Sequence, residues 1–233
     1  MDELPHEGLA RREAIRLADS PGVVAVLLAG SVARGEHACC SDVDILVVGP
    51  PQGVLEPTRV MGGVSVERLC NTPDEWKLRF NRVGTSWLYE FLDVVVLYDP
   101  DGVGRQLQLE AARVLHQYCT PKEQRANLRR ELIHGVAKLD RARLSGESAW
   151  AGFWAALPVF TLLSGLFALH DVPLPGASRM MRELPRVGLS EWESGHVGQL
   201  LTGDTEQRLA AAQALCDYLI EALGHEPAGG KGG

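Results

Sequence analysis

Cysteine is scarce in this sequence, and its few copies do not form any familiar motif. The five cysteines are an odd number without a Cys-x-x-Cys pair: Cys39, Cys40, Cys70, Cys119 and Cys216. Structural zinc sites and disulfide-stapled secreted domains need regular cysteine pairs. The cysteine pattern argues against both classes and predicts reduced thiols in a cytoplasmic protein.

Positive charge is also in short supply. Lys and Arg number 23 against 30 Asp and Glu, which gives a formal net charge of −7. Nonspecific binding to nucleic acid needs a basic face, so we expect no nucleic-acid partner. An acidic cleft would instead attract a cationic substrate.

Targeting and membrane-spanning segments are not expected. The start, Met1-Asp2-Glu3, is acidic and lacks the apolar stretch of a signal peptide. Residues 150–169 carry no charge and exceed the roughly 18 residues that can mark a membrane span. This run contains Pro158 and has no flanking basic cluster. We interpret it as a helix buried on all sides in a bundle, with a homodimer interface as a further expectation.

The most informative feature is a pair of alternating carboxylates after a Gly-Ser turn. An apolar run over residues 23–29 ends at Gly30-Ser31, and a second apolar run opens with Asp42 and Asp44. Side chains at i and i+2 of a strand point to the same face, so these two carboxylates lie together. Hard oxygen ligands of this kind suit Mg²⁺ bound next to substrate phosphates. The pattern predicts a magnesium site beside a nucleotide.

The residues around the turn are candidates for contacting the nucleotide. Gly30 lets the backbone approach a phosphate without a side chain in the way. Ser31 offers a hydroxyl and is expected to cap a short helix over residues 32–36, whose N-terminus would attract an anion. Arg34 either pairs with the triphosphate or is an exposed helix arginine. Ser41, directly before the acid pair, completes the set of candidates.

Residues 22–48 resemble the signature of the DNA polymerase β-like nucleotidyltransferase superfamily. Within it, Gly-Ser-Val-Ala-Arg-Gly followed by Ser-Asp-Val-Asp is similar to the aminoglycoside nucleotidyltransferases and the minimal nucleotidyltransferases. The resemblance implies an α+β fold with a mixed sheet flanked by helices. It also implies two Mg²⁺ ions, ATP or another nucleoside triphosphate as substrate, and transfer of a nucleoside monophosphate with release of pyrophosphate. Two metal ions would stabilise the attacking and the leaving oxygen of such a displacement.

Family members use a third carboxylate on a later strand, for which Glu67 and Asp93 are the candidates. Glu67 follows the Gly62-Gly63 hairpin turn. A neighbouring strand lies only about 4.8 Å away, so a carboxylate there can reach the same ions. Glu67 would bind metal or act as general base on the acceptor hydroxyl. Asp93 stays open as the alternative, and Glu67 is preferred.

The chain divides by pattern into a mixed part, a helical part and a tail. We predict a nucleotidyltransferase domain over residues 1–102, a helical bundle over 103–224 and a disordered Gly-rich tail over 225–233. Strands are expected at 22–29, 42–48, 58–61, 64–70 and 92–98. Helices are expected at 4–17, 72–80, 103–118, 121–144, 148–169, 177–184, 191–200 and 205–223. A catalytic head with a bundle resembles aminoglycoside nucleotidyltransferases, which implies that the bundle serves the acceptor pocket or dimerisation, with Glu131 and Asp140 as candidate bases.

Two functions follow from the resemblance. The first is an adenylyltransferase that moves AMP from ATP onto a hydroxyl of a small molecule, with an aminoglycoside-type antibiotic as the suggested acceptor and antibiotic resistance as the result. The second is an antitoxin-like minimal nucleotidyltransferase that binds or AMPylates a protein partner. Arg129 and His134 have the spacing of the Arg-x4-His motif of HEPN ribonucleases, which pair with minimal nucleotidyltransferases. No residue identifies the acceptor or the nucleobase.

Overall fold

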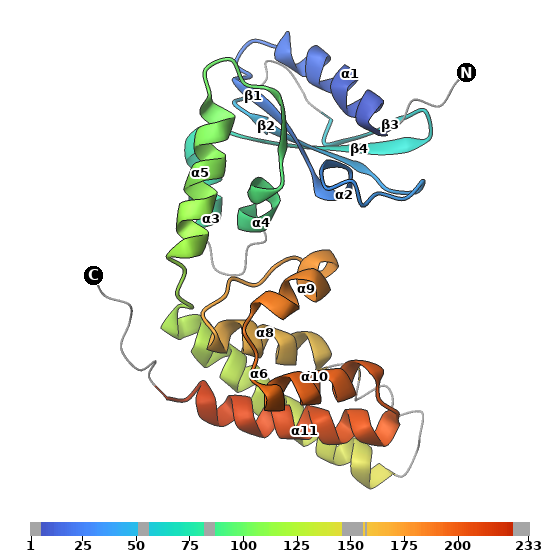
Figure 1. Cartoon of the computed structure of the whole chain (residues 1–233), viewed down its shortest axis with the longest axis vertical. Coiled ribbons are helices and arrows are strands. Elements are labelled where there is room, and N and C mark those ends of the chain that lie inside the picture. Colours follow the sequence, from blue (N-terminus) through green and yellow to red (C-terminus); the bar gives the residue numbers. More distant parts are fainter. Residues whose placement is uncertain (1–5, 51–55, 82–86, 146–155, 157, 226–233) are drawn as a thin grey trace. The chain divides into compact units, whose positions relative to one another are not determined.

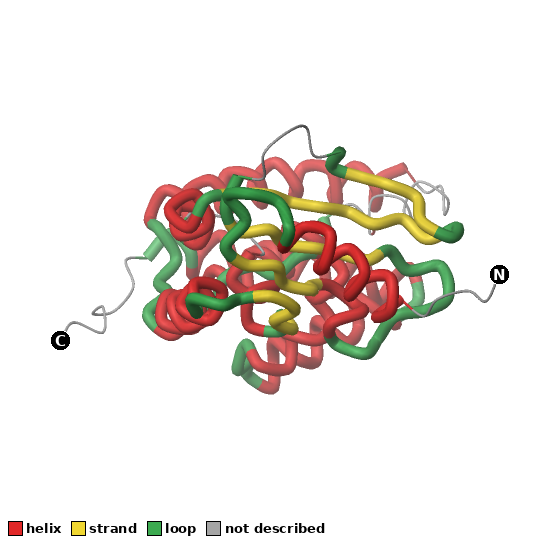
Figure 2. Tube along the Cα trace, turned by 90° about the horizontal axis from the view of Figure 1, so that it is seen from above, coloured by secondary structure: helices red, strands yellow, loops and turns green. Residues whose placement is uncertain are grey.

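The computed structural model describes residues 6–50, 56–81, 87–145, 156 and 158–225. By its internal contacts the chain forms two compact units, Met1–Gln117 and Tyr118–Gly233. Figure 1 shows the elements of each unit, and Figure 2 shows that all strands gather in one sheet. The predicted disordered tail lies outside the described residues except for His225.

The first unit is built on a five-stranded mixed sheet with the order β3-β4-β2-β1-β5. Its strands are β1 (Ala25–Ala29), β2 (Val43–Val48), β3 (Thr58–Met61), β4 (Val64–Asn71) and β5 (Val95–Tyr98). The pairing of β2 with β4 is parallel, and the other pairings are antiparallel. Together with the helical second unit, this sheet confirms the predicted α+β class.

Helices cover both faces of the sheet. One face carries α1 (His6–Ala18), and the other carries α3 (Pro73–Phe80), α4 (Trp87–Leu92) and α5 (Val103–His116). Successive residues of a strand point to opposite faces. On β1, Leu28 therefore joins the core under α1, and Leu27 joins the core under α3 to α5. The apolar runs of β1 and β2 are explained by burial on both faces.

Helix α3 begins where its sequence predicts. The Thr72 hydroxyl accepts a hydrogen bond from the Glu75 backbone N–H at 3.2 Å, and the Glu75 carboxylate accepts one from the Thr72 N–H at 2.8 Å. This reciprocal capping box satisfies donors that a helix leaves unpaired at its start. Trp76, one residue on, is fully buried and donates its indole N–H to the Val47 carbonyl. The cap thus fixes α3 on the sheet.

The strand predicted over residues 92–98 was wrong in its first part. Residues Trp87–Leu92 form helix α4, and the strand begins only at Val95. Leu88 and Phe91, three positions apart, are both buried against the sheet, as one face of a helix requires. The apolar residues on either side of Asp93 hid this change of period, because short apolar runs suit either structure.

Helix α5 belongs to the first unit, whereas the sequence placed residues 103–118 with the bundle. The chain divides after Gln117, and Leu107 and Ala111 are buried in the core beneath the sheet. Gly104 packs so closely that a β-carbon there would lie 2.9 Å from a methyl group of Leu27. The spacing of the apolar residues predicted the helix and its apolar face. It does not indicate which of the two hydrophobic cores that face packs into.

The second unit is an all-helical bundle. Its elements are α6 (Lys122–Ser145), α8 (Val159–Leu169), α9 (Ala177–Glu183), the 3-10 turn η1 (Leu184–Arg186), α10 (Glu191–Thr202) and α11 (Thr205–Ala222). Residues 162–168 of α8 are all buried, and a β-carbon on Gly165 would lie 2.9 Å from Leu219 of α11. Most of the segment predicted as the first half of this helix, residues 148–155 and 157, lies outside the described residues.

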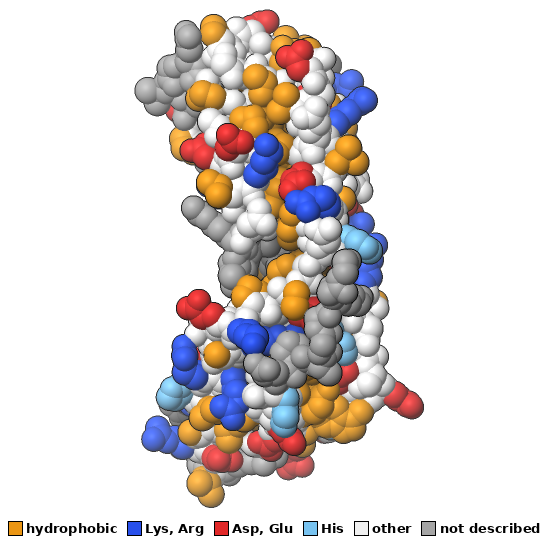
Figure 3. Space-filling view, turned by 90° about the vertical axis from the view of Figure 1, so that its left-hand side faces the viewer, with side chains coloured by type: hydrophobic (Ala, Val, Ile, Leu, Met, Phe, Trp, Pro, Cys, Tyr) orange, Lys and Arg blue, Asp and Glu red, His pale blue; other side chains and the backbone are white. Residues whose placement is uncertain are grey.

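Membrane spans were sought in the described part of the chain, and none of its helices combines the length and apolarity that crossing a bilayer requires. Acidic and basic side chains lie interspersed on the face shown in Figure 3.

Inside the bundle, the Glu193 carboxylate accepts hydrogen bonds from the Ser190 N–H at 2.7 Å and the Tyr218 hydroxyl at 3.3 Å, and its Oε1 lies 2.9 Å from His170 Nε2. Burial opposes ionisation of Glu193, but the hydrogen bonds from His170 and Ser190 outweigh it and lower the pKa of the carboxyl.

Candidate active site

Three carboxylates converge at one end of the sheet. One oxygen each of Asp42, Asp44 and Glu67 lies within 4.8 Å of the others. Asp44 on β2 is the direct partner of Glu67 on β4 in the parallel pairing, so both side chains project from the same face. Asp42 precedes Asp44 by two residues and joins them. Strand pairing therefore assembles the acid cluster, which we define as these three residues.

Gly30 leaves room for the acid cluster. It directly follows Ala29, the antiparallel partner of Asp44. Its φ of +68° is a conformation that other residues adopt only with strain, and a β-carbon at this position would overlap the Asp44 carboxylate. Glycine is thus required twice here, once for the backbone turn and once for the space that the carboxylate occupies.

The acid cluster carries strong negative potential. Burial raises the pKa of Asp44 to about 6, with further contributions from the charges of Asp42, Glu67 and Glu90, while Arg34 opposes the rise. A divalent cation between the carboxylates would relieve this repulsion, and hard oxygen donors are the ligands that Mg²⁺ prefers. The donor set of three carboxylates fits a divalent-metal site of this kind.

Arg34 is half-buried and paired with carboxylates. Its Nε donates to Glu36 Oε2 at 2.8 Å, and its Nη1 lies 3.5 Å from Glu90 Oε2. Only 10% of its side chain is exposed. Two alternatives were predicted for Arg34, and the one in which it is an exposed helix arginine is wrong. Contact with a triphosphate stays a prediction.

Both serines make hydrogen bonds in the segment that leads from β1 to the acid cluster. The Ser41 hydroxyl accepts a hydrogen bond from the Ala38 N–H at 2.9 Å, and the Ser41 carbonyl lies 3.0 Å from His6 Nε2. The Ser31 carbonyl accepts a hydrogen bond from the Glu36 N–H at 2.9 Å. These three contacts order the chain that leads into Asp42. A role of either serine in holding the nucleotide is still a prediction.

The helix predicted over residues 32–36 with Ser31 as its cap was wrong. Helix α2 spans Gly30–Ala33, with Ala29 in the capping position and no side-chain cap. The chain turns as soon as β1 ends, because the positive φ of Gly30 lets it do so. Ser31 therefore lies inside the short helix.

Asp93, the alternative third carboxylate, does not belong to the acid cluster. It lies between α4 and β5, and among the described residues the clustered acids are Asp42, Asp44 and Glu67. The sequence missed Glu90, whose charge adds to that around Asp44. Glu90 lies on α4, a helix that was not predicted. The spacing of Leu88 and Phe91 was the signal that could have revealed it.

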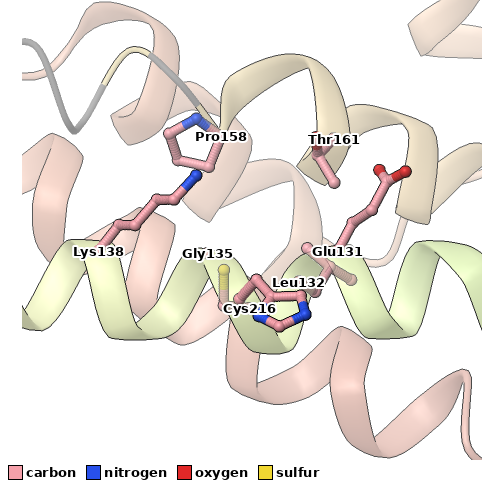
Figure 4. Close-up of a pocket in the computed structure, with 8 residues that line it drawn as sticks. Glu131, Leu132, Gly135, Lys138, Pro158, Thr161 and Cys216 are labelled. Atoms are coloured by element: carbon pink, nitrogen blue, oxygen red, sulfur yellow. The ribbon is translucent and has the colours of Figure 1, made fainter.

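The second unit has a cavity of its own, of about 280 Å³. Figure 4 shows Glu131 and Lys138 rising from α6 on either side of Gly135, with Thr161 of α8 above them. Cys216 also lines the cavity, and burial raises the pKa of its thiol to about 12. Glu131, one of the two bases predicted in the bundle, therefore lines a cavity, and Asp140 is not among its lining residues.

The Arg-x4-His pair does not converge on this cavity. His134 lines it, whereas Arg129 donates its Nε–H to the Ile220 carbonyl at 2.8 Å. Five positions on an α-helix correspond to a rotation of about 140° between the two side chains. Arg129 thereby ties α6 to the C-terminal end of α11.

Residues 12–89 match the family described as nucleotidyltransferase domain. The chain carries a nucleotidyltransferase domain. The matched residues lie within the first unit and include the acid cluster and Gly30. A domain of this family makes the protein a transferase enzyme. The substrates of such a domain are nucleoside triphosphates.

Two individual proteins show weaker likeness. The chain is 29% identical over 184 residues to LolD, the ATP-binding protein of a lipoprotein-releasing system from Ruegeria pomeroyi, a match that covers 75% of this chain and 76% of that protein. The sequence contains no G-x-x-x-x-G-K-[ST] phosphate-binding loop. The crystal structure of a nucleotidyltransferase-like protein from Exiguobacterium sibiricum matches at 14% identity and a TM-score of 0.39, covering 91% of this chain and 74% of that one. Neither likeness assigns an activity to this chain.

Proposed function

We propose that the protein is a magnesium-dependent adenylyltransferase that moves AMP from ATP onto a hydroxyl of a small cationic molecule, of which aminoglycoside-type antibiotics are the leading class. The observation that carries the proposal is the acid cluster of Asp42, Asp44 and Glu67, whose oxygens lie within 4.8 Å of one another. The nucleotidyltransferase domain over residues 12–89 supports it.

In this proposal two members of the acid cluster, Asp42 and Asp44, hold the metal. Mg²⁺ bound there would neutralise phosphate charge and stabilise the attacking and leaving oxygens of an in-line displacement. Both residues supply carboxylate oxygens, and Gly30, which makes room for the Asp44 carboxylate, is the proposed backbone contact for the triphosphate. The acceptor hydroxyl attacks the α-phosphorus, the bond to the bridging oxygen breaks, and pyrophosphate leaves.

Glu67 is the proposed base for the acceptor hydroxyl. It is the more exposed end of the acid cluster, since Asp42 and Asp44 are half-buried. A base must reach the proton that it accepts, and an exposed carboxylate at the rim of the metal site is open to a second substrate. Glu67 would take the hydroxyl proton as the new oxygen–phosphorus bond forms.

Charge supports a cationic acceptor. The chain carries a net charge of −7, and the three carboxylates of the acid cluster add negative charge locally. Negative potential at a cleft raises the local concentration of cations. Antibiotics with several amino groups and hydroxyls fit both requirements. Their positive charge is attracted to the site, and a hydroxyl supplies the attacking nucleophile.

The experiment is a substrate screen with matched variants. The purified chain is incubated with Mg²⁺, each of the four nucleoside triphosphates and a panel of hydroxylated cationic antibiotics. Products are detected as mass shifts of one nucleoside monophosphate, together with released pyrophosphate. Asp44→Asn serves as the inactive variant. Asp74→Asn is its control, because Asp74 lies on α3 with its side chain 90% exposed.

The expected result is an AMP-modified small molecule made by the wild type and by Asp74→Asn but not by Asp44→Asn. Turnover that survives in Asp44→Asn would contradict the site assignment. AMP found on a co-purified protein, with every small acceptor unmodified, would replace this function with the antitoxin-like one.

A further inference from the structure

Arg34 is held between two carboxylates from different parts of the first unit. Glu36 lies two residues away, whereas Glu90 comes from helix α4. Arg34 Nε donates to Glu36 Oε2 at 2.8 Å, and Nη1 lies 3.5 Å from Glu90 Oε2. The guanidinium is thus held by one carboxylate at Nε and lies beside a second carboxylate at Nη1.

The contact between Arg34 and Glu90 is largely withdrawn from water. The side chains are 10% and 18% exposed. Arg34 Nη1 and Glu90 Oε2 are both buried and lack a hydrogen-bond partner among the described residues. A desolvated charge is costly unless an opposite charge compensates it. Each of these two atoms therefore depends on the other for its stabilisation.

Helix α4 fixes Glu90 firmly in place. Leu88, Tyr89 and Phe91 surround Glu90 in the sequence and are at most 4% exposed. The Phe91 ring packs edge-on against Trp76 and Phe80 of α3. A carboxylate carried by such a rigid segment loses little conformational freedom when it orients a partner.

We propose that Glu90 is a positioning residue that orients the Arg34 guanidinium toward the triphosphate of the bound nucleotide. The inference rests on the proposed function. Glu36 and Glu90 occupy Nε and Nη1, and the remaining face of the planar guanidinium is left for phosphate oxygens, which arginine binds in a fixed fork geometry. Glu90 lies outside the acid cluster, and so acts through Arg34 without ligating metal.

The test measures nucleotide affinity without turnover. The dissociation constant of Mg²⁺ with the non-hydrolysable α,β-methylene analogue of ATP is determined by calorimetry for wild type, Glu90→Gln, Arg34→Ala and the double variant. Glutamine keeps the size of Glu90 and removes its charge. Glu110→Gln is the matched control, because Glu110 pairs with Arg113 on the exposed side of α5.

We expect Glu90→Gln to weaken binding about tenfold, because the substitution removes the charge of a desolvated ion pair that orients the guanidinium. In the Arg34→Ala background the same substitution should change nothing further, because the partner it orients is gone. Glu90→Asp, which keeps the charge, should recover part of the loss. Glu110→Gln should bind like the wild type.

Two results would overturn the positioning role alone. One is unchanged affinity in Glu90→Gln while the wild type binds nucleotide and turns it over. The other is an equal loss in the wild-type and Arg34→Ala backgrounds, which would show that Glu90 acts independently of Arg34. A wild type that binds no nucleotide with Mg²⁺ would instead overturn the proposed function, and this inference with it.

Discussion

Asp44 and Glu67 are direct partners across the parallel pairing of β2 with β4. They are separated by a hairpin and a long connection in the sequence, yet the register brings both carboxylates to one face of the sheet. Asp42 joins from two residues earlier on the chain. The acid cluster therefore depends on one strand register, and a slip of one residue would send Glu67 to the opposite face.

Removal of a single carboxylate tests the cluster. Glu67→Gln should lower the turnover number by about 10²- to 10⁴-fold, the usual contribution of a general base. It should leave the folded fraction unchanged, because Glu67 is exposed. Pyrophosphate release with the identified acceptor measures the effect, and Asp74→Asn on the exposed side of α3 is the control. A loss below threefold would leave Glu67 without a role in the proton transfer.

Gly30 and Gly35 form a matched pair for a second prediction. Both have a φ of +68°, but a β-carbon on Gly30 would overlap the Asp44 carboxylate, whereas one on Gly35 meets nothing within 4 Å. Gly35→Ala should cost about 1–2 kcal/mol through backbone strain alone. Gly30→Ala should cost more and should also abolish nucleotide turnover. Denaturant unfolding and pyrophosphate release, measured on both variants, separate strain from displacement of the carboxylate.

Metal binding should depend on pH through Asp44. Burial and the neighbouring carboxylates raise the pKa of this group to about 6 in the folded protein, while in the unfolded chain it is about 4. The folded state thus holds the proton more tightly, and metal-free stability falls as pH rises from about 4 to about 6. Mg²⁺ binds the ionised form, so the rise in melting temperature caused by Mg²⁺ should grow between pH 5 and pH 7.

Thermal unfolding with and without Mg²⁺ across this pH range measures the effect. The same titration on Asp44→Asn is the control, because asparagine cannot ionise. A magnesium-induced shift of equal size at pH 5 and pH 7 in the wild type would contradict the assignment of Asp44 as a ligand.

A buried ion pair joins α1 to the sheet on the side away from α4. Glu13 and Arg68 are 1% and 2% exposed in their side chains, and Glu13 Oε1 lies 2.7 Å from Arg68 Nε. Glu13→Ala would leave a buried cation without its partner, which costs about 3–5 kcal/mol. Denaturant unfolding measures the loss. Glu110→Ala, which breaks the more exposed pair with Arg113, should lower the stability far less, because exposed ion pairs contribute little.

Much of the site could be predicted because its signals are local. The spacing of Asp42 and Asp44, the Gly-Ser turn and the capping box at Thr72 each depend on residues close together in the chain. Local geometry repeats wherever such residues occur. Helix α4 was missed because local signals are ambiguous there, since the short apolar runs on either side of Asp93 suit helix and strand alike.

The sequence by itself determined that an apolar segment turns at Gly30 and that two acids share a face after it, because periodicity and glycine conformation are properties of neighbouring residues. The tertiary structure decided which distant groups meet them. It selected Glu67 over Asp93 through the register of β2 and β4, placed Glu90 beside Arg34, and assigned α5 to the first unit. These choices depend on which surfaces pack together, and packing between elements leaves no periodic trace along the chain.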